Sequence, residues 1–273
     1  MIRNKVATGL AFFASLVFSG TVLAGGFVEL EGEFDEDSPE LTNPWWPHPE
    51  NTRYVYLSET EDECVVGVVD VLPDDGTMIK GVEVRTLWDR EWVVEDECPD
   101  DLSGIIEDEE PVESTYDWYA QDITGVIWYF GEYSVATDHD ECDHPTDGAD
   151  PVFGLDGCLD GSWQAGFDIW ENEADDEILE GIIMLADPQK GQFYFQEYWE
   201  DEATDMGKIL SFKTVNTFLY GEQEGCLVVK EWVPLSPGNV EHKYYCHGFG
   251  LVLVQGNAGG KTEWTDLVEV SDL

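Results

Sequence analysis

The fold is indicated most clearly by residues 116–131, which read YDWYAQDITGVIWYFG. Apolar and aromatic residues recur with a period of two on both sides of a short break, Asp122 to Gly125. A period of two is typical of a strand, because successive side chains point to opposite faces, and a break containing Asp and Gly is typical of a turn. The stretch therefore predicts a β-hairpin that turns at Asp122 to Gly125.

The same period of two dominates the rest of the chain. The segment Pro73-Asp-Asp-Gly76 is a strong turn signal after one apolar run. Only residues 200–210 suggest a short helix, and their apolar stripe is thin. Further strands are predicted at 53–58, 64–72, 81–94, 192–199, 225–232, 241–248 and 250–255. We therefore expect an all-β fold of antiparallel strands.

The predicted strands of the first half of the chain resemble those of the second half. The hairpin at 116–131 resembles residues 241–256, and two shorter strands upstream of each hairpin, at 81–88 and 53–56, have counterparts at 225–232 and 192–195. Because the order is the same in both halves, we predict two related β-units, sandwich-like or half-barrel-like, at 42–135 and 180–273. Residues 136–179 would be an insertion and connector, rich in Asp, His and Cys. The alternative is a chance resemblance between hairpins.

The N-terminus has the pattern of a secretory signal peptide over residues 1–24. Arg3 and Lys5 precede an apolar run, and Val22-Leu-Ala24 places small residues where a signal peptidase cleaves. We expect cleavage after Ala24 and a secreted or periplasmic product, followed by an acidic flexible linker at 25–41. A retained membrane anchor is the alternative. Residue 25, directly after Ala24, is not a cysteine, and no later run has about 18 apolar residues, so neither a lipid anchor nor membrane insertion is expected.

The six cysteines, all after residue 24, predict disulfides, because an even number in an exported chain is typical of a disulfide framework. Folding the chain at a turn near Ser236 places Cys226 opposite Cys246, since both are equally far from that turn. Cys142 with Cys158 would close a short loop rich in Asp and Gly, and Cys64 with Cys98 follows by elimination. Without a CxxC motif, neither redox catalysis nor a structural zinc site is expected.

The charge of the chain is strongly negative. There are 12 Lys and Arg against 60 Asp and Glu, a formal charge of −48 at pH 7. Removing Arg3 and Lys5 with the predicted signal peptide leaves 10 basic against 60 acidic residues, a charge of −50. Nucleic acid and anionic lipid are disfavoured partners, because phosphate contacts need Lys and Arg. Such self-repulsion requires screening by salt or by bound divalent cations. The simplest interpretation is the acidic surface of a halotolerant protein.

Disorder is the other interpretation of a high charge. It does not suit most of this chain, because 42% of the residues are hydrophobic and 13% aromatic. Enough apolar material is present for a core.

Several motifs together resemble a family of uncharacterised bacterial exported proteins and lipoproteins. They are YDWYAQD at 116–122, VIWYFGE at 126–132, GSWQAG at 161–166, GIIMLADP at 181–188, FQEY at 195–198, KEWVPLSPG at 230–238, HKYY at 242–245 and GFGLV at 248–252. The resemblance covers about residues 53–270 and implies a β-rich architecture and export, but no activity. The chain departs from that pattern in a longer insertion around 137–160 and in a plain signal peptide where many relatives carry a lipid anchor.

The richest candidate site is the Asp-rich stretch within the insertion. Calcium takes six to eight oxygen ligands from carboxylates and carbonyls on a flexible backbone, and a loop of Asp and Gly closed by a disulfide can supply them. The spacing does not match an EF-hand loop, and a solvated acidic loop is the alternative. The candidate metal ligands are Asp138, His139, Asp140, Asp143, His144, Asp147, Asp150, Asp156 and Asp160.

Two histidines in that stretch permit a different ion. His139 and His144 would suit copper, nickel or zinc, since imidazole binds these ions well. The acidic runs Asp35-Glu-Asp37 with Glu40, and Glu107-Asp-Glu-Glu110, are typical of linkers or solvated faces.

The sequence contains no recognisable catalytic motif. It lacks HExxH, a Walker loop, GxGxxG and a nucleophile elbow. Aromatic strands around Trp118, Trp128, Trp163 and Trp170 would line a carbohydrate groove, although such residues more often form a core.

We therefore expect a secreted, non-enzymatic binding or structural protein that takes up divalent cations, calcium above all, through acidic loops. The alternatives are a polysaccharide-active hydrolase or carbohydrate-binding protein with an aromatic, carboxylate-lined groove, and an exported copper-binding protein. Expected partners are divalent cations and a polysaccharide or another extracellular protein.

Overall fold

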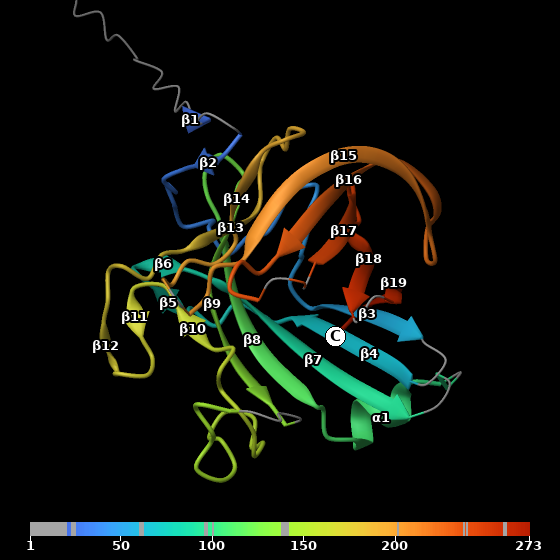
Figure 1. Cartoon of the computed structure of the whole chain (residues 1–273), viewed down its shortest axis with the longest axis horizontal. Coiled ribbons are helices and arrows are strands. Elements are labelled where there is room, and N and C mark those ends of the chain that lie inside the picture. The colour runs from blue at the N-terminus through green and yellow to red at the C-terminus, as the bar shows by residue number, and fades with distance from the viewer. Residues whose placement is uncertain are drawn as a thin grey trace, which may run out of the picture.

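The computed structural model describes residues 21–22, 26–59, 63–95, 98–99, 101–137, 142–200, 202–236, 238, 240–258 and 261–273. Its regular structure is almost entirely β (Figure 1). The elements are β1 Thr21–Val22, β2 Val28–Glu29, β3 Thr52–Glu59, β4 Glu63–Val71, β5 Met78–Ile79, β6 Val82–Glu83, β7 Arg85–Glu95, α1 Ser103–Asp108, β8 Glu113–Gln121, β9 Ile127–Ala136, β10 Trp163–Gln164, β11 Phe167–Asp168, β12 Glu173–Ala174, β13 Gly181–Met184, β14 Phe193–Phe195, β15 Met206–Thr217, β16 Gly221–Trp232, β17 Val240–Cys246, β18 Gly250–Ala258 and β19 Lys261–Asp272.

The main sheet is antiparallel and follows the order β12-β11-β10-β9-β8-β7-β4-β3-β19-β18-β17-β16-β15-β14, with β13 paired to β9. The all-β, antiparallel fold class is thus confirmed. The sheet curls, so that β7, β8 and β9 form one side and the strongly bent β15 and β16 arch over the other (Figure 1). Strands from 42–135 and from 180–273 belong to this one sheet, and they meet where β3 pairs with β19 and where β13 pairs with β9.

The predicted hairpin at 116–131 is confirmed as β8 and β9. Its turn is built around Asp122, whose Oδ1 accepts hydrogen bonds from the backbone amides of Thr124 (2.9 Å) and Val126 (3.0 Å). Its Oδ2 accepts one from Trp128 Nε1 at 3.0 Å. Gly125 has a φ of 93°, which a side chain would disfavour. The Asp-to-Gly spacing therefore satisfies the turn locally and fixes the strand register.

The sheet has two faces with separate cores. The inner face carries the main core, which includes Tyr54, Tyr119, Tyr129, Leu227 and Leu267 from strands on both sides of the curl. The outer face of β3, β4 and β7 carries a smaller core beneath α1, which includes Val55, Val66, Val68, Trp92 and Ile105. Strand alternation thus supplies each core from different residues of the same strands.

All three predicted disulfides are present: Cys64–Cys98, Cys142–Cys158 and Cys226–Cys246. In the last pair, the register of β16 with β17 sets Leu227 against Tyr245. The cysteines are therefore opposite each other, as the turn near Ser236 predicted.

Two sequence expectations differ from the structure. The helix expected at 200–210 is wrong, because residues from Met206 onward form β15 along the whole of β16. The pairing with β16 outweighs the weak helical pattern. The one helix among the described residues is α1, between the disulfide-bonded Cys98 and β8, and no described helix is long and apolar enough to cross a membrane.

The predicted linker at 25–41 is also ordered where it is described. Ser38 and Leu41 are buried, and Phe34 contacts the ring of Phe130 at 5.5 Å. Backbone amides of β8 and its turn donate to this segment, from Gln121 to Ser38 and from Ile123 to Glu33. Its scattered apolar residues dock it along the sheet despite its charge. The signal-peptide prediction lies outside the described residues except for Thr21–Val22, which form β1.

Candidate functional site

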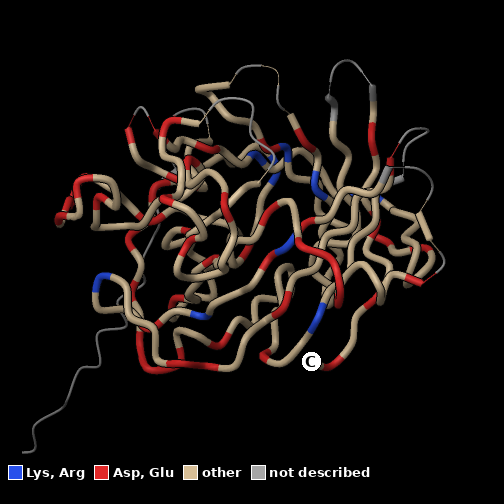
Figure 2. Tube along the Cα trace, turned by 90° about the horizontal axis from the view of Figure 1, so that it is seen from below, with Lys and Arg blue, Asp and Glu red and all other residues tan. Residues whose placement is uncertain are grey.

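Acidic residues are spread over strands and loops throughout the chain, whereas Lys and Arg are few (Figure 2). Most of the acids are exposed, where water and salt screen their charges. The exceptions are informative, because a carboxylate that is removed from water must be protonated or paired.

Asp70, Asp122 and Asp150 are buried singly in other parts of the fold, whereas a group of such exceptions lies together on the inner face of the sheet, beside the main core. We call this group the inner acidic cluster, defined by Asp117, Glu132, Glu197, Asp205 and Glu231. Asp117 is 8% exposed, and the other four are partly buried. Asp117 and Glu132 come from β8 and β9, Glu231 comes from β16 on the opposite side of the curl, and the remaining two come from the segment that connects β14 to β15. Lys243 of β17 is the basic residue that contacts the cluster.

The first part of the cluster is a pair of carboxylates bridged by a tyrosine. The hydroxyl of Tyr129 lies 2.6 Å from Asp117 Oδ1 and 2.9 Å from Glu132 Oε2. A register shift between Trp118 and Tyr119 sets Asp117 directly opposite Glu132 while Tyr119 pairs with Tyr129. The two tyrosine rings stack at 4.6 Å, so the bridging hydroxyl is held by packing as well as by hydrogen bonds.

The second part surrounds Lys243. Its Nζ lies 2.7 Å from a Glu231 carboxylate oxygen, and the hydroxyl of Tyr245 donates to the other oxygen at 3.3 Å. Burial lowers the pKa of Lys243, but the Glu231 and Glu241 carboxylates outweigh this effect and hold the pKa above its usual value. The ammonium group therefore remains charged at all relevant pH values and neutralises one carboxylate.

The remaining carboxylates have raised pKa values. Burial raises the pKa of Glu197 to about 8, and the charges of Asp205 and Asp117 add to the rise while Lys243 opposes it. Burial likewise raises the pKa of Asp205 to about 6, with a further contribution from Glu231.

The pKa values of the two carboxyl groups in the tyrosine-bridged pair are also raised. Burial raises the pKa of Asp117 to about 6, although the Tyr129 hydrogen bond lowers it. The pKa of Glu132 is raised by burial and by the charges of Glu197 and Asp117. The cluster therefore holds protons near neutral pH that ordinary carboxylates would have lost.

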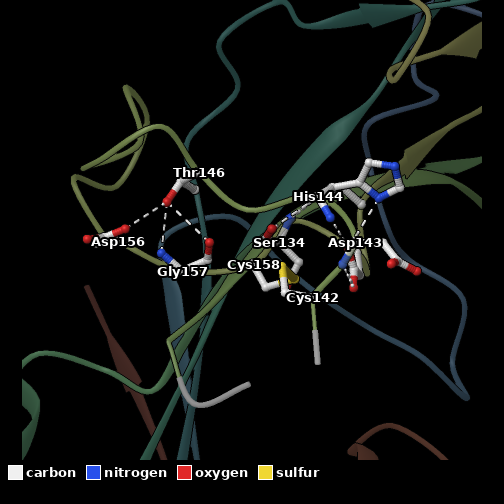
Figure 3. Close-up of a disulfide and its surroundings, with 10 residues drawn as sticks. Ser134, Cys142, Asp143, His144, Thr146, Asp156, Gly157 and Cys158 are labelled. Atoms are coloured by element: carbon white, nitrogen blue, oxygen red, sulfur yellow. Dashed lines mark hydrogen bonds and ion pairs between the residues drawn. A yellow bond between two sulfur atoms is a disulfide. The ribbon is translucent and has the colours of Figure 1, made fainter. Parts of the chain in front are cut away.

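The predicted metal loop is organised differently. Asp160 accepts hydrogen bonds from the amides of Asp143 and His144, at 3.1 and 2.8 Å, and His144 Nδ1 lies 3.2 Å from the same carboxylate. Thr146 bonds to Asp156 and Gly157 beside the Cys142–Cys158 disulfide (Figure 3). These acids close turns of the loop.

Asp150 of the same loop is 5% exposed and accepts backbone amides of Val152, Phe153 and Leu155. Asp147 is exposed. Asp138, His139 and Asp140 lie outside the described residues, and the metal assignment of the loop stays a prediction. Of the residues that the structure describes, one group, Cys142, Cys158 and Asp160, places three ligand-type atoms within 4.8 Å of one another. Its two sulfurs form a disulfide and are not free to ligate.

The aromatic residues proposed for a groove occupy different places. Trp128 and Trp163 are buried in the main core, as aromatic strand residues commonly are. Trp170 stacks on His144, with ring centres 3.9 Å apart. Tyr129 and Tyr245, which hydrogen-bond to the inner acidic cluster, were not singled out in the sequence. In the sequence, nothing distinguishes these two tyrosines from the other aromatic residues of the strands. In the structure, each is the inner-facing aromatic residue beside a β-bulge in a hairpin.

Fold and site together define an all-β, disulfide-bonded protein with a desolvated acidic cluster on the inner face of a curled sheet. No protein-family model matches the chain, and no curated protein matches it. Two solved structures match the chain over most of its length. One is a Bacteroides fragilis protein described as exported with a YmcC-like fold, at 11% identity, covering 83% of this chain and 98% of that one, with a TM-score of 0.38. The other is a Parabacteroides distasonis protein described as a lipoprotein, at 10% identity, covering 84% and 99%, with a TM-score of 0.35.

Proposed function

We propose that the protein is an exported, non-enzymatic binding protein whose inner acidic cluster takes up divalent cations, calcium above all. The observation that carries the proposal is a group of five partly or fully buried carboxylates that influence one another's charge, of which one, Glu231, contacts the ammonium group of Lys243. The N-terminal sequence and the three disulfides support export.

The inner acidic cluster has more carboxylates than basic groups to neutralise them. Lys243 neutralises one carboxylate. The other four avoid a buried negative charge by staying protonated to a higher pH, as their raised pKa values indicate. At a pH above these values the protons leave, and the negative charges then repel one another in a poorly hydrated space. A divalent cation would replace the protons and remove that repulsion. Calcium suits the ligands, since it prefers carboxylate oxygens and tolerates irregular geometry.

The spacing of the cluster indicates how the ion would be held. Among the described residues, no three of its carboxylate oxygens lie within 4.8 Å of one another. We therefore expect water in part of the coordination shell, as is common for calcium and magnesium. The bridging hydroxyl of Tyr129 provides a further oxygen between two of the carboxylates.

Calorimetric titration with CaCl₂ at pH 8 and moderate NaCl tests the proposal. Wild-type protein should bind with defined stoichiometry, and binding should weaken at pH 5, because protons compete for the same oxygens. The double variant Glu132→Gln/Glu197→Gln should bind at least tenfold more weakly.

The matched control is Glu222→Gln/Glu224→Gln, which removes the same charge from exposed positions near the start of β16. It should bind like the wild type. Equal weakening in both double variants would show nonspecific condensation on an acidic surface and would overturn the proposal. Loss confined to Asp147→Asn/Asp156→Asn would place the ion in the Asp-rich loop instead.

A polysaccharide hydrolase is a second candidate, favoured by the tyrosine-bridged pair. The hydroxyl of Tyr129 lies 2.6 Å from Asp117 Oδ1 and 2.9 Å from Glu132 Oε2. The distance between these two carboxylate oxygens therefore cannot exceed the sum of the two hydrogen-bond lengths. Carboxyl groups about 5 to 5.5 Å apart are typical of retaining glycosidases, in which one is the nucleophile and the other the acid. The raised pKa of Glu132 suits the acid and leaves Asp117 for the nucleophile.

This candidate predicts new reducing ends when the protein is incubated with neutral polysaccharides. Asp117→Asn should lower the rate by at least a hundredfold, because the nucleophile would be lost. Asp176→Asn, an exposed position, serves as the control and should retain full activity. If wild-type protein releases no reducing ends from any substrate in the panel, the hydrolase interpretation fails and the cation proposal is unaffected.

A further inference from the structure

An arginine is buried among aromatic rings on the outer face of the sheet, opposite the inner acidic cluster. Arg90 is 8% exposed, and its guanidinium carbon lies 3.9 Å from the centre of the Trp88 ring and 5.6 Å from that of Trp92. The three residues alternate along β7 and therefore share one face. Burial lowers the pKa of this guanidinium, against the opposing effect of Asp70, yet it remains a cation at neutral pH.

The positive charge of Arg90 is only partly neutralised, because its carboxylate partner also binds a second arginine. Asp70 of β4 binds both Nε and Nη2 of Arg53, at 2.6 and 2.7 Å, and Nη2 of Arg90 donates to the same carboxylate. Two guanidinium groups thus share one carboxylate. The Nε of Arg90 is buried and has no hydrogen-bond partner among the described residues. Buried polar groups in proteins are nearly always bonded, so an unused donor here requires an explanation.

A cavity adjoins this arginine. It has a volume of about 250 Å³ and is lined by Arg90 together with Trp88, Trp92, Tyr116, Phe153 and Leu155. Phe153 contacts Tyr116 at 4.7 Å in an edge-on arrangement and lies nearly parallel to Trp88, with an angle of 5° between the rings. The loop that carries Phe153 is fixed by the hydrogen bonds of Asp150 to three backbone amides. The aromatic wall is therefore built by the fold.

We propose that this pocket binds a small organic anion, a monocarboxylate with a compact apolar body. The aromatic and aliphatic walls would cover the apolar part, and the carboxylate would lie against the part of the Arg90 guanidinium that borders the cavity, as a charge-assisted contact. The volume is below that of a pocket for a drug-sized molecule, which limits the ligand to one ring or a short chain. The one acid in the lining, Glu109, is exposed, so water weakens its repulsion.

The charge of the whole chain gives the proposal a distinctive signature. A formal charge of −48 repels an approaching anion over long range, and salt screens that repulsion. The attraction of Arg90 acts over a short distance inside the protein and is screened much less. Affinity for the carboxylate should therefore rise with NaCl concentration, opposite to the usual behaviour of an exposed ion-pair site.

Titration with benzoate, followed by tryptophan fluorescence and calorimetry, tests the proposal. Benzoate should bind saturably, and benzamide, its neutral counterpart, should bind at least tenfold more weakly. Arg90→Met should abolish binding of benzoate, whereas Arg53→Met, which removes the same charge from the same network outside the cavity, should preserve it. If Arg90→Met does not fold, Phe153→Ala replaces it, because this loop substitution removes one wall and should weaken binding at least tenfold.

Three results would each overturn the proposal: no saturable binding of benzoate, equal binding of benzoate and benzamide, or unchanged binding in the substituted pocket. The cavity lies on the opposite face of the sheet from the inner acidic cluster. The outcome of the benzoate titration is therefore independent of the outcome of the calcium titration.

Discussion

Replacing Glu197 with glutamine is expected to stabilise the protein at pH 8 and to change its stability little at pH 5. Glutamine keeps the shape of the side chain but never carries a charge. At pH 5 the glutamate is already protonated, because burial raises its pKa from 4.5 to about 8. At pH 8 the wild-type side chain is ionised in a large fraction of molecules and repels Asp205 and Asp117, so the substitution removes an unfavourable charge.

The sign follows from proton linkage. The folded protein binds more protons than the unfolded chain between pH 4.5 and about 8 at Glu197, and between 3.8 and about 6 at Asp117 and Asp205. The free energy of unfolding therefore falls as the pH rises through these windows. Each pKa unit corresponds to about 1.4 kcal/mol, and coupling and partial hydration reduce the total, so Glu197→Gln should gain on the order of 2 kcal/mol at pH 8.

Urea denaturation at pH 5 and pH 8 measures this gain. Glu222→Gln removes one charge from an exposed position and reports the general relief of self-repulsion. In 1 M NaCl the general effect should vanish, whereas the gain at Glu197 should persist because the site is poorly hydrated. A Glu197→Gln curve that coincides with that of Glu222→Gln at both pH values would contradict the raised pKa.

The cost in stability bears on why the cluster exists. A protein that gains stability when an acidic side chain is neutralised retains that acid for something other than folding. In the cation proposal, calcium at pH 8 should raise the stability of the wild type and have little effect on Glu132→Gln/Glu197→Gln. Stabilisation by substitution and by ligand would then have the same cause.

The fold could be predicted largely because its signals are local. The hairpin at 116–131 is determined by the alternation of its strands and by Asp122, whose hydrogen-bond donors all lie within six residues of it. The pairing of Cys226 with Cys246 follows from counting outward from one turn. The docked segment after residue 25 was missed because its charge outweighed its scattered apolar residues, of which Val28 and Leu41 are buried.

The inner acidic cluster could not be predicted because it depends on non-local register. Asp117 and Glu132 come together because the register of β8 with β9 pairs them directly, and Glu231 reaches the same face because the sheet curls (Figure 1). With 60 acidic residues in the chain, no local pattern distinguishes these five from the rest. Partial burial on one shared face, and not the sequence around each acid, sets them apart.

Replacing Asp70 with asparagine is expected to cost about 3–5 kcal/mol, because it leaves two guanidinium groups without their shared anion. Asp70 is 3% exposed and accepts hydrogen bonds from both Arg53 and Arg90. Asparagine can accept from one of them but neutralises neither, and Arg90, which is 8% exposed, is little hydrated. The midpoint of urea denaturation at pH 7 should fall accordingly, with an unchanged dependence on urea concentration.

The exposed Asp176→Asn is the control for the loss of one carboxylate, and it should alter stability by less than about 0.5 kcal/mol. The double variant Asp70→Asn/Arg90→Met removes the buried cation together with its anion and leaves Arg53, whose side chain is 30% exposed and can be hydrated. It should therefore be more stable than Asp70→Asn alone, with a coupling energy of at least about 1 kcal/mol. If the effects of the two substitutions simply add, the guanidinium is not an uncompensated charge, and the rationale for an anion in the outer pocket falls with it.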